Sequence, residues 1–157
     1  MTGPIVVING PNLNLLGQRQ PEVYGSGTLA DARAAALNEA AASGLDVEFF
    51  QSNHEGDLID RIHAERGRAS GLVINAGGLS HTSVALRDAL VLSTCPVVEV
   101  HVGNIHRRET YRHHSYLSEV ADGVIVGLGI DGYALAVRRL VAVAESAGRA
   151  PVPTAVR

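Results

Sequence analysis

The sequence predicts an α/β fold in which a five-stranded parallel sheet carries helices on both faces. Short runs rich in Val and Ile alternate along the chain with longer stretches of helical periodicity. The apolar runs are unbroken, which is typical of strands that are buried on both faces. Five such units in 157 residues indicate a single flavodoxin-like, doubly wound domain.

The expected strands lie at residues 5–9, 45–50, 71–75, 97–101 and 123–127. The expected helices lie near residues 28–43, 56–68, 82–92 and 132–147, with a short one near 107–113. One catalytic domain is expected over residues 1–148, followed by a disordered tail over 149–157. Ligands bind beyond the carboxyl ends of the strands in such sheets, so we expect a site in the segments that follow the strands.

The composition argues against several classes of function. The net charge is −3, and the chain has no Trp, two Phe and four Tyr. It therefore offers neither a basic stripe nor a stacking surface for nucleic acid. All thirteen basic residues are Arg, which leaves no lysine side chain for Schiff-base chemistry.

A cytoplasmic location is expected, because no export signal precedes the first apolar run and no run is long enough to span a membrane. The single cysteine, Cys95, excludes an internal disulfide. It precedes Pro96 at the start of an apolar run. We interpret it as a small core residue rather than a catalytic thiol.

The loop after the first expected strand is long and carries two residues suited to acid–base chemistry. It runs from Gly10 to Gly27, well past the usual two to six residues, and such long loops are commonly functional lids. It contains Arg19 and Tyr24. A tyrosine is a poor base at neutral pH, but a nearby guanidinium favours its phenolate form. The alternative is that Tyr24 only anchors the loop and Arg19 is a surface charge.

Polar residues also follow the third and fourth expected strands. Asn75 and His81 flank a turn that opens a helix, with Ser80 as the expected N-cap, and both could bond hydroxyl groups of a ligand. A capping turn with an incidental histidine is the alternative. Glu99 and His101 are two apart in a strand and therefore share a face. A carboxylate beside an imidazole favours the protonated ring and orients it, which suits a general acid.

Two further motifs favour neither a metal nor a nucleotide cofactor. Residues 105–116 are dense in His and Arg but lack the His-x-x-x-His and His-Glu-x-x-His spacings, so we expect arginines that grip an anionic or polyhydroxylated ligand. Residues 127–132 fit G-x-G-x-x-G, yet no acidic residue ends a following strand, as a dinucleotide site requires. Tight packing of strand against helix is the interpretation of these glycines.

Together these segments resemble type II 3-dehydroquinate dehydratase, an enzyme of the shikimate and quinate pathways. The resemblance runs from about Pro4 to about Glu145. It rests on NGPNLNLLGQRQPEVYG, FFQSNHEGDLID, INAGGLSHTSVALRDAL and VVEVHVGNIHRRETYRHHSY, which continues into ADGVIVGLGIDGY. It implies a flavodoxin-like hydro-lyase with a small-molecule substrate and no metal or cofactor, in trimers that assemble into a dodecamer.

The resemblance also implies roles for individual residues. Tyr24, assisted by Arg19, would take a proton from carbon 2 of the cyclic ketone, and a water near Asn12 would stabilise the enolate. His101, oriented by Glu99, would protonate the departing hydroxyl on carbon 1. The other implied contacts are Asn75, His81 and Arg112 to ring hydroxyls, Asp88 from a neighbouring subunit, and the backbone amides of Val102 and Gly103 to the substrate carboxylate.

Three positions depart from the usual pattern of the family. Gly103 stands where Ser is usual, Gly78 where Ala is common and Gln20 where Glu is frequent. None of these is an implied acid or base, so we expect activity, with room for a changed substrate such as an amino analogue. Two other classes remain as alternatives: a flavodoxin-like module that binds FMN or a phosphorylated ligand, and a protein that only oligomerises.

Overall fold

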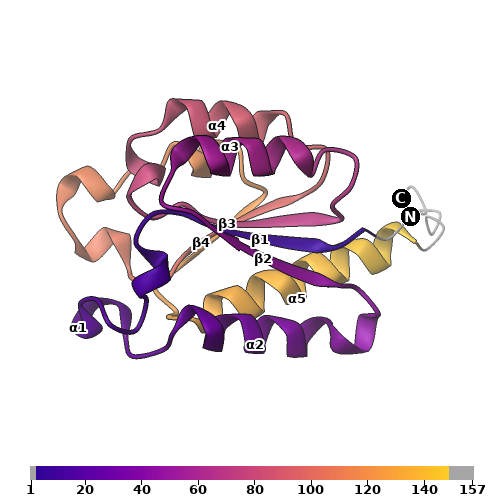
Figure 1. Ribbon diagram of the computed structural model, residues 1–157, viewed down its shortest axis with the longest axis horizontal. Coiled ribbons are helices and arrows are strands. Elements are labelled where there is room, and N and C mark those ends of the chain that lie inside the picture. Colours follow the sequence, from indigo (N-terminus) through magenta and orange to yellow (C-terminus); the bar gives the residue numbers. More distant parts are fainter. Residues whose placement is uncertain (1–2, 149–157) are drawn as a thin grey trace, which may run out of the picture.

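The computed structural model describes residues 3–148. They form three layers, in which a parallel sheet with strand order β2-β1-β3-β4-β5 lies between two layers of helices (Figure 1). The strands are β1 (Ile5–Asn9), β2 (Val47–Gln51), β3 (Gly71–Asn75), β4 (Val97–His101) and β5 (Gly123–Val126). Helices α2 (Leu29–Ala40) and α5 (Asp131–Ala147) cover one face, and α3 (Glu55–Ala64) and α4 (Val84–Val91) cover the other. The expected five-stranded flavodoxin-like fold is confirmed, while the expected tail at 149–157 lies outside the described residues.

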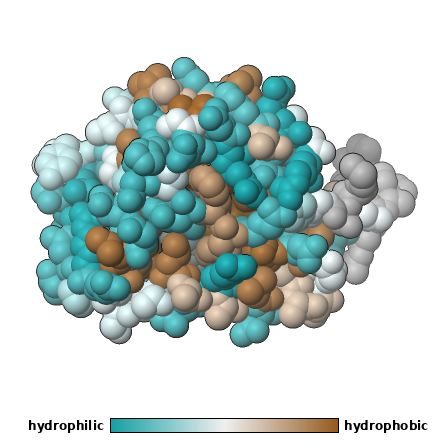
Figure 2. Space-filling view, in the orientation of Figure 1, coloured by the Kyte–Doolittle hydropathy of each residue, from teal (hydrophilic) through white to brown (hydrophobic). Residues whose placement is uncertain are grey.

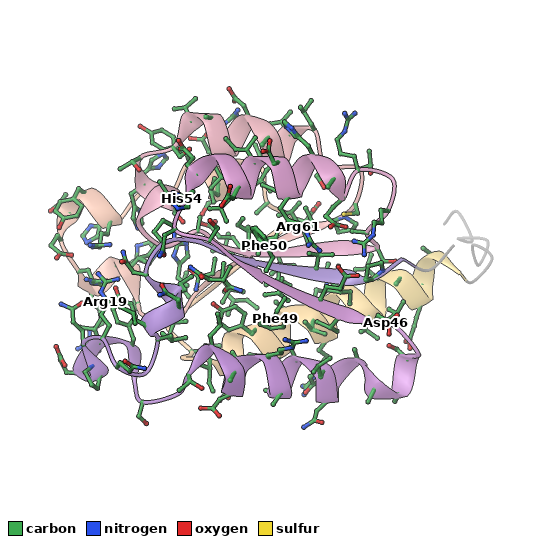
Figure 3. All side chains as sticks on the ribbon, viewed as in Figure 1. Arg19, Asp46, Phe49, Phe50, His54 and Arg61 are labelled. Atoms are coloured by element: carbon green, nitrogen blue, oxygen red, sulfur yellow. The ribbon has the colours of Figure 1, made fainter. Side chains whose placement is uncertain are left out.

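The unbroken apolar runs form the central strands, and their side chains supply two cores. All residues of β1, β3 and β4 are buried. Along β1, Ile5 and Val7 pack under α2 and α5, whereas Val6 and Ile8 pack under α3 and α4. β2 forms one edge, and its two phenylalanines point to opposite faces of the sheet (Figure 3). The alternation of side chains along each strand thus divides the apolar residues between the two faces.

β2 and α4 each begin two residues later than expected. β2 begins at Val47 rather than at residue 45, because Gly44 takes a left-handed conformation (φ 72°) and Val47 pairs with Ile5. Ser80 is not the N-cap of α4, so that prediction was wrong. Ser83 caps this helix instead, since its side chain accepts a hydrogen bond of 2.9 Å from Leu86 N.

The helix expected near 107–113 is absent from the described chain, which has two short 3-10 turns there: η4 (Ile105–Arg107) and η5 (Thr110–Arg112). Arg108 and Glu109 lie between the turns with extended backbone (ψ −167° and 144°). This interruption prevents a continuous helix and gives each turn its own direction.

The connections after the strands gather at the carboxyl end of the sheet, where the short helix α1 (Pro21–Tyr24) lies near the turns η4 and η5 (Figure 1). The side with the β2 edge is mostly hydrophilic, with apolar residues between the two helical layers (Figure 2). Within residues 3–148, no helix is long and apolar enough to cross a membrane.

The glycines of residues 127–132 serve the passage from β5 into α5. Gly127 and Gly129 have left-handed backbone (φ 81° and 62°), which glycine adopts without steric cost. A Cβ on Gly132 would lie 3.1 Å from Val100 Cγ1. Close packing of α5 on β4 therefore accounts for this glycine, as expected.

Candidate active site

One cavity of about 150 Å³ lies beyond the carboxyl ends of β1, β3 and β4. Nine of the eleven residues expected in a site line it: Asn12, Arg19, Tyr24, Asn75, His81, His101, Val102, Gly103 and Arg112. Its other lining residues are Pro11, Leu13, Leu16, Gly77, Gly78, Ile105 and Arg108. Arg19 extends from the loop beside α1 (Figure 3).

Two arginines lie over the Tyr24 ring, and only one of them was expected. The guanidinium carbon of Arg19 lies 5.7 Å from the centre of the Tyr24 ring. Arg108 lies at 5.3 Å, and its Nη1 donates a hydrogen bond of 2.5 Å to the Tyr24 hydroxyl. A guanidinium is always charged and stabilises negative charge on an oxygen that it bonds. Arg108 was not singled out from the sequence, although arginines from its segment were expected.

His101 and Glu99 form the expected pair, with 2.7 Å between Nε2 and Oε1. Both are buried. A carboxylate only accepts, so Nε2 carries the proton and Nδ1 is the nitrogen left for the cavity. Burial alone would raise the pKa of the Glu99 carboxyl, but hydrogen bonds from His101, Ser115 and Ser118 outweigh it and hold this pKa below its usual value. Glu99 thus stays ionised behind the His101 ring.

His81 presents a neutral ring to the same cavity. Its Nδ1 lies 2.7 Å from the backbone oxygen of His114, which can only accept, so Nδ1 carries the proton. Burial lowers the pKa of His81, and the positive charges of His101 and Arg112 add to this, against the opposing effects of the His114 oxygen and Glu99. The Nε2 atom of a neutral His81 is consequently a hydrogen-bond acceptor.

Asn75 is held by a buried network that connects four elements. Its Nδ2 donates to the Tyr133 hydroxyl (2.8 Å), which donates to Asn9 Oδ1 (2.7 Å), and Asn9 Nδ2 donates to the backbone oxygen of Phe50 (3.2 Å). The backbone N–H of Gly77 bonds Asn75 Oδ1 (3.2 Å). The amide orientation of Asn75 is therefore fixed, which leaves one N–H of its Nδ2 for another partner.

Asn12 has left-handed backbone (φ 70°), which is uncommon outside glycine. Its N–H donates to the side-chain oxygen of Asn53 (2.9 Å), which also accepts from Gln51 Nε2 (3.1 Å). The loop after β2 thereby supports the start of the loop after β1. Gln20, one of the three departures, is exposed and has a left-handed backbone as well (φ 42°).

Two expected residues do not line the cavity. Glu99 lies behind His101, and Asp88 lies on α4 with 65% of its side chain exposed, bonded to Arg87 at 3.2 Å. Cys95 is also away from the cavity. It is half-buried and packs against the α3/α4 core, and burial raises the pKa of its thiol. Both features disfavour a reactive thiolate at Cys95.

The cavity lining carries positive charge, from the guanidiniums of Arg19, Arg108 and Arg112, and its lining residues include no carboxylate. Among residues 3–148, no group of three or more His, Cys, Asp and Glu side chains could hold a metal ion. A tyrosine under two guanidiniums and a carboxylate-backed histidine border this one cavity. The fold and site thus define an α/β protein equipped for acid–base chemistry on a small anionic molecule.

Comparison with known proteins identifies the family of this chain. The pattern of the dehydroquinase class II family matches residues 3–141, and the chain belongs to that family. The family resemblance seen in the sequence is confirmed.

Two relatives and one solved structure are similar over most of the chain. The 3-dehydroquinate dehydratase of Streptomyces avermitilis is 61% identical over 150 residues, covering 94% of this chain and 92% of that protein. Catabolic 3-dehydroquinase 1 of Aspergillus terreus is 56% identical over 140 residues, covering 89% and 92%. The crystal structure of the type II dehydroquinase from Propionibacterium acnes has a TM-score of 0.85 at 42% identity, covering 90% of this chain and 98% of that one.

Proposed function

We propose that this protein dehydrates 3-dehydroquinate to 3-dehydroshikimate, with Tyr24 as the base and His101 as the acid. One observation carries the proposal: both groups border a single cavity, and each has its own charged partner. Arg108 bonds the Tyr24 hydroxyl, and Glu99 bonds the His101 ring. Family membership and relatives named 3-dehydroquinate dehydratase support the same substrate.

The first step removes a proton from carbon 2, beside the ketone on carbon 3. The ionised oxygen of Tyr24 takes this proton, and the electron pair of the C–H bond moves toward the ketone oxygen to form an enolate. Before the step, the guanidiniums of Arg19 and Arg108 stabilise the negative charge on the Tyr24 oxygen. A water held by Asn12 then donates a hydrogen bond to the enolate oxygen, where charge develops.

The second step expels the hydroxyl of carbon 1. The enolate electrons form the double bond between carbons 1 and 2, and the hydroxyl leaves as water with a proton from Nδ1 of His101. The Nε2–H of His101 stays on the ring and remains hydrogen-bonded to Glu99, which stabilises the charged ring before the transfer and holds its orientation.

The remaining groups of the site would bind the substrate. Asn75, Arg112 and the acceptor Nε2 of His81 suit the ring hydroxyls, and the backbone amides of Val102 and Gly103 suit the carboxylate. We further propose that the protein forms trimers that assemble into a dodecamer. The exposure of Asp88 on α4 supports its expected role in the site of a neighbouring subunit.

The direct test is conversion of 3-dehydroquinate, followed by the absorbance of the conjugated enone acid. Tyr24→Phe and His101→Ala should each lower kcat by roughly 10²- to 10⁴-fold, the usual contribution of a general acid or base. Matched controls are Tyr111→Phe, at an exposed tyrosine, and His63→Ala, at an exposed histidine, neither of which lines the cavity. Near-normal turnover by either site variant would contradict its assigned role.

Three further measurements distinguish the proposed dehydration from a metal-dependent reaction, a Schiff-base reaction, and a different substrate or ligand. Activity should persist in EDTA, and loss that a divalent ion restores would contradict a metal-free site. Borohydride with substrate should not inactivate the enzyme, since no lysine is present. Preferred turnover of the amino analogue would assign a different substrate, whereas FMN bound after purification and no dehydration would favour the binding module.

A further inference from the structure

The carboxylate of Glu99 is fully buried, and no arginine bonds it in the described chain. It is held instead by one imidazole and two hydroxyls. His101 Nε2 and Ser115 Oγ both reach Oε1, and Ser118 Oγ reaches Oε2. A buried charge is costly unless hydrogen bonds satisfy it. The two serines therefore supply most of the donors that let this group stay ionised.

The hydroxyl of Ser115 can point only toward Glu99. Its oxygen accepts a hydrogen bond of 3.2 Å from the backbone N–H of Leu117, so the single hydroxyl proton is left for the carboxylate. Ser115 is itself buried, which removes water as a competing partner. This geometry makes Ser115 a fixed donor rather than an incidental contact.

The segment that carries both serines also contacts the second histidine of the cavity. The His114 backbone oxygen accepts from His81 Nδ1 (2.7 Å), and Tyr116 N donates to the backbone oxygen of Ser80 (2.9 Å). Residues 114–118 are thereby tied to the turn η3 (Gly77–His81) and to β4 at once. One short segment thus fixes the protonated nitrogen of His81 directly and that of His101 through Glu99.

We propose that Ser115 and Ser118 are positioning residues, whose hydroxyls keep the proton of the Glu99–His101 pair on the imidazole and hold that ring in its proton-donating orientation. The proposal rests on the proposed function of His101 as the acid. Without the hydroxyls, the buried Glu99 carboxylate would have unsatisfied lone pairs. The Glu99–His101 pair would then bind its additional proton at a higher pH, and this proton would lie closer to Glu99 than in the parent protein.

The test is NMR of protein with ¹⁵N-labelled histidine, recorded without substrate. In the parent protein, His101 should show a protonated Nε2 and become a charged imidazolium as the pH falls. In Ser118→Ala and Ser115→Ala, the pair should titrate at higher pH with a smaller imidazolium signal from His101. In the dehydration assay, kcat should fall roughly 10- to 100-fold while KM changes little, as for loss of a hydrogen bond to a charged group.

A rescue and a control separate positioning from mere stability. Ser118 is half-buried, so Ser118→Thr keeps the hydroxyl and should restore both the titration and kcat. Ser70→Ala removes a hydroxyl that bonds the Gly3 backbone, away from the cavity, and should change neither. The other charged and titratable groups that line the cavity beside His101 are Arg19, Tyr24, His81, Arg108 and Arg112. All five are unchanged in every variant, so they cannot account for a difference between the variants.

A His101 titration in Ser118→Ala that matches the parent would overturn the proposal, and so would failure of Ser118→Thr to restore the Ser118→Ala change. If Ser115→Ala does not fold, the Ser118 pair of variants alone decides. If the parent does not dehydrate 3-dehydroquinate, the proposed function fails, while the titration still decides whether the serines place the proton.

Discussion

The Arg108 guanidinium reaches the Tyr24 hydroxyl across 84 positions of sequence and donates a hydrogen bond of 2.5 Å to it. Arg19, the partner expected from the sequence, approaches the face of the same ring. Of these two arginines, only Arg108 bonds the oxygen on which the proposed mechanism places negative charge. The two arginines therefore differ in what they contribute to the base.

We predict that Arg108→Ala lowers kcat by roughly 10- to 100-fold, because loss of a hydrogen bond to the charged Tyr24 oxygen leaves less of the base in its ionised form. Arg108→Lys keeps a positive charge but loses the planar fork, so it should recover only part of the rate. Arg33→Ala, at an exposed arginine on α2, is the control in the same enone assay. A rate for Arg108→Ala equal to that of Arg33→Ala would show that the bond does not support the base.

Most of the cavity could be predicted from the sequence because its residues end strands or directly follow them. Asn75 ends β3 and His101 ends β4, so the strand pattern alone places both at the carboxyl edge of the sheet. The loop with Arg19 and Tyr24 follows β1. Short-range sequence order therefore carries most of the information on which side chains meet.

Arg108 and Tyr133 could not be predicted in the same way. Arg108 is half-buried while its neighbour Arg107 is exposed, and the choice depends on where the turn η4 ends and the backbone becomes extended. Tyr133 bonds Asn75, 58 positions away, and it lies in helix α5, whose apolar pattern is typical of an ordinary core helix. Such contacts depend on how α5 packs on the sheet, which local periodicity does not specify.

The Tyr133 hydroxyl supplies a second prediction, since it bridges Asn9 and Asn75 inside the core. Tyr133→Phe would leave a buried acceptor on Asn9 and a buried donor on Asn75 unpaired, which costs about 1–3 kcal/mol. We expect a lower urea midpoint, and a raised KM because the Asn75 amide is no longer fixed. Tyr111→Phe at the surface should change neither quantity. An unchanged midpoint for Tyr133→Phe would contradict a structural role for the bridge.

Gly103 leaves room for the hydroxyl that the family usually carries there. A Cβ at this position would be 3.5 Å from the Val23 backbone oxygen and 3.7 Å from Tyr24 Cε1, both ordinary contacts. We predict that Gly103→Ser folds normally and lowers KM roughly 2- to 10-fold, as one added hydrogen bond to the substrate carboxylate would. kcat should stay the same because Ser touches no proposed acid or base atom.

Two other glycines provide matched controls for this measurement. Gly123 lies in β5, does not line the cavity and has no atom within 4 Å of an added Cβ, so Gly123→Ala should leave KM unchanged. Gly10→Ala would place its Cβ 2.4 Å from the Ala76 backbone oxygen and should destabilise the fold. An unchanged or raised KM in a well-folded Gly103→Ser would contradict carboxylate binding at this position.

The burial of His81 should make the protein less stable at acidic pH. Burial lowers its pKa from the ordinary value of 6.5, and the charges of His101 and Arg112 act in the same direction. Below about pH 6.5, His81 is consequently protonated in the unfolded chain but still neutral in the folded chain. The free energy of unfolding should therefore fall as the pH drops from 6.5 toward the lowered pKa of the folded state. Urea midpoints at pH 7.5 and 5.5 measure this. The decrease should be smaller in His81→Gln than in the parent or in the exposed control His63→Gln, whereas equal decreases in all three would assign the acid sensitivity to other groups.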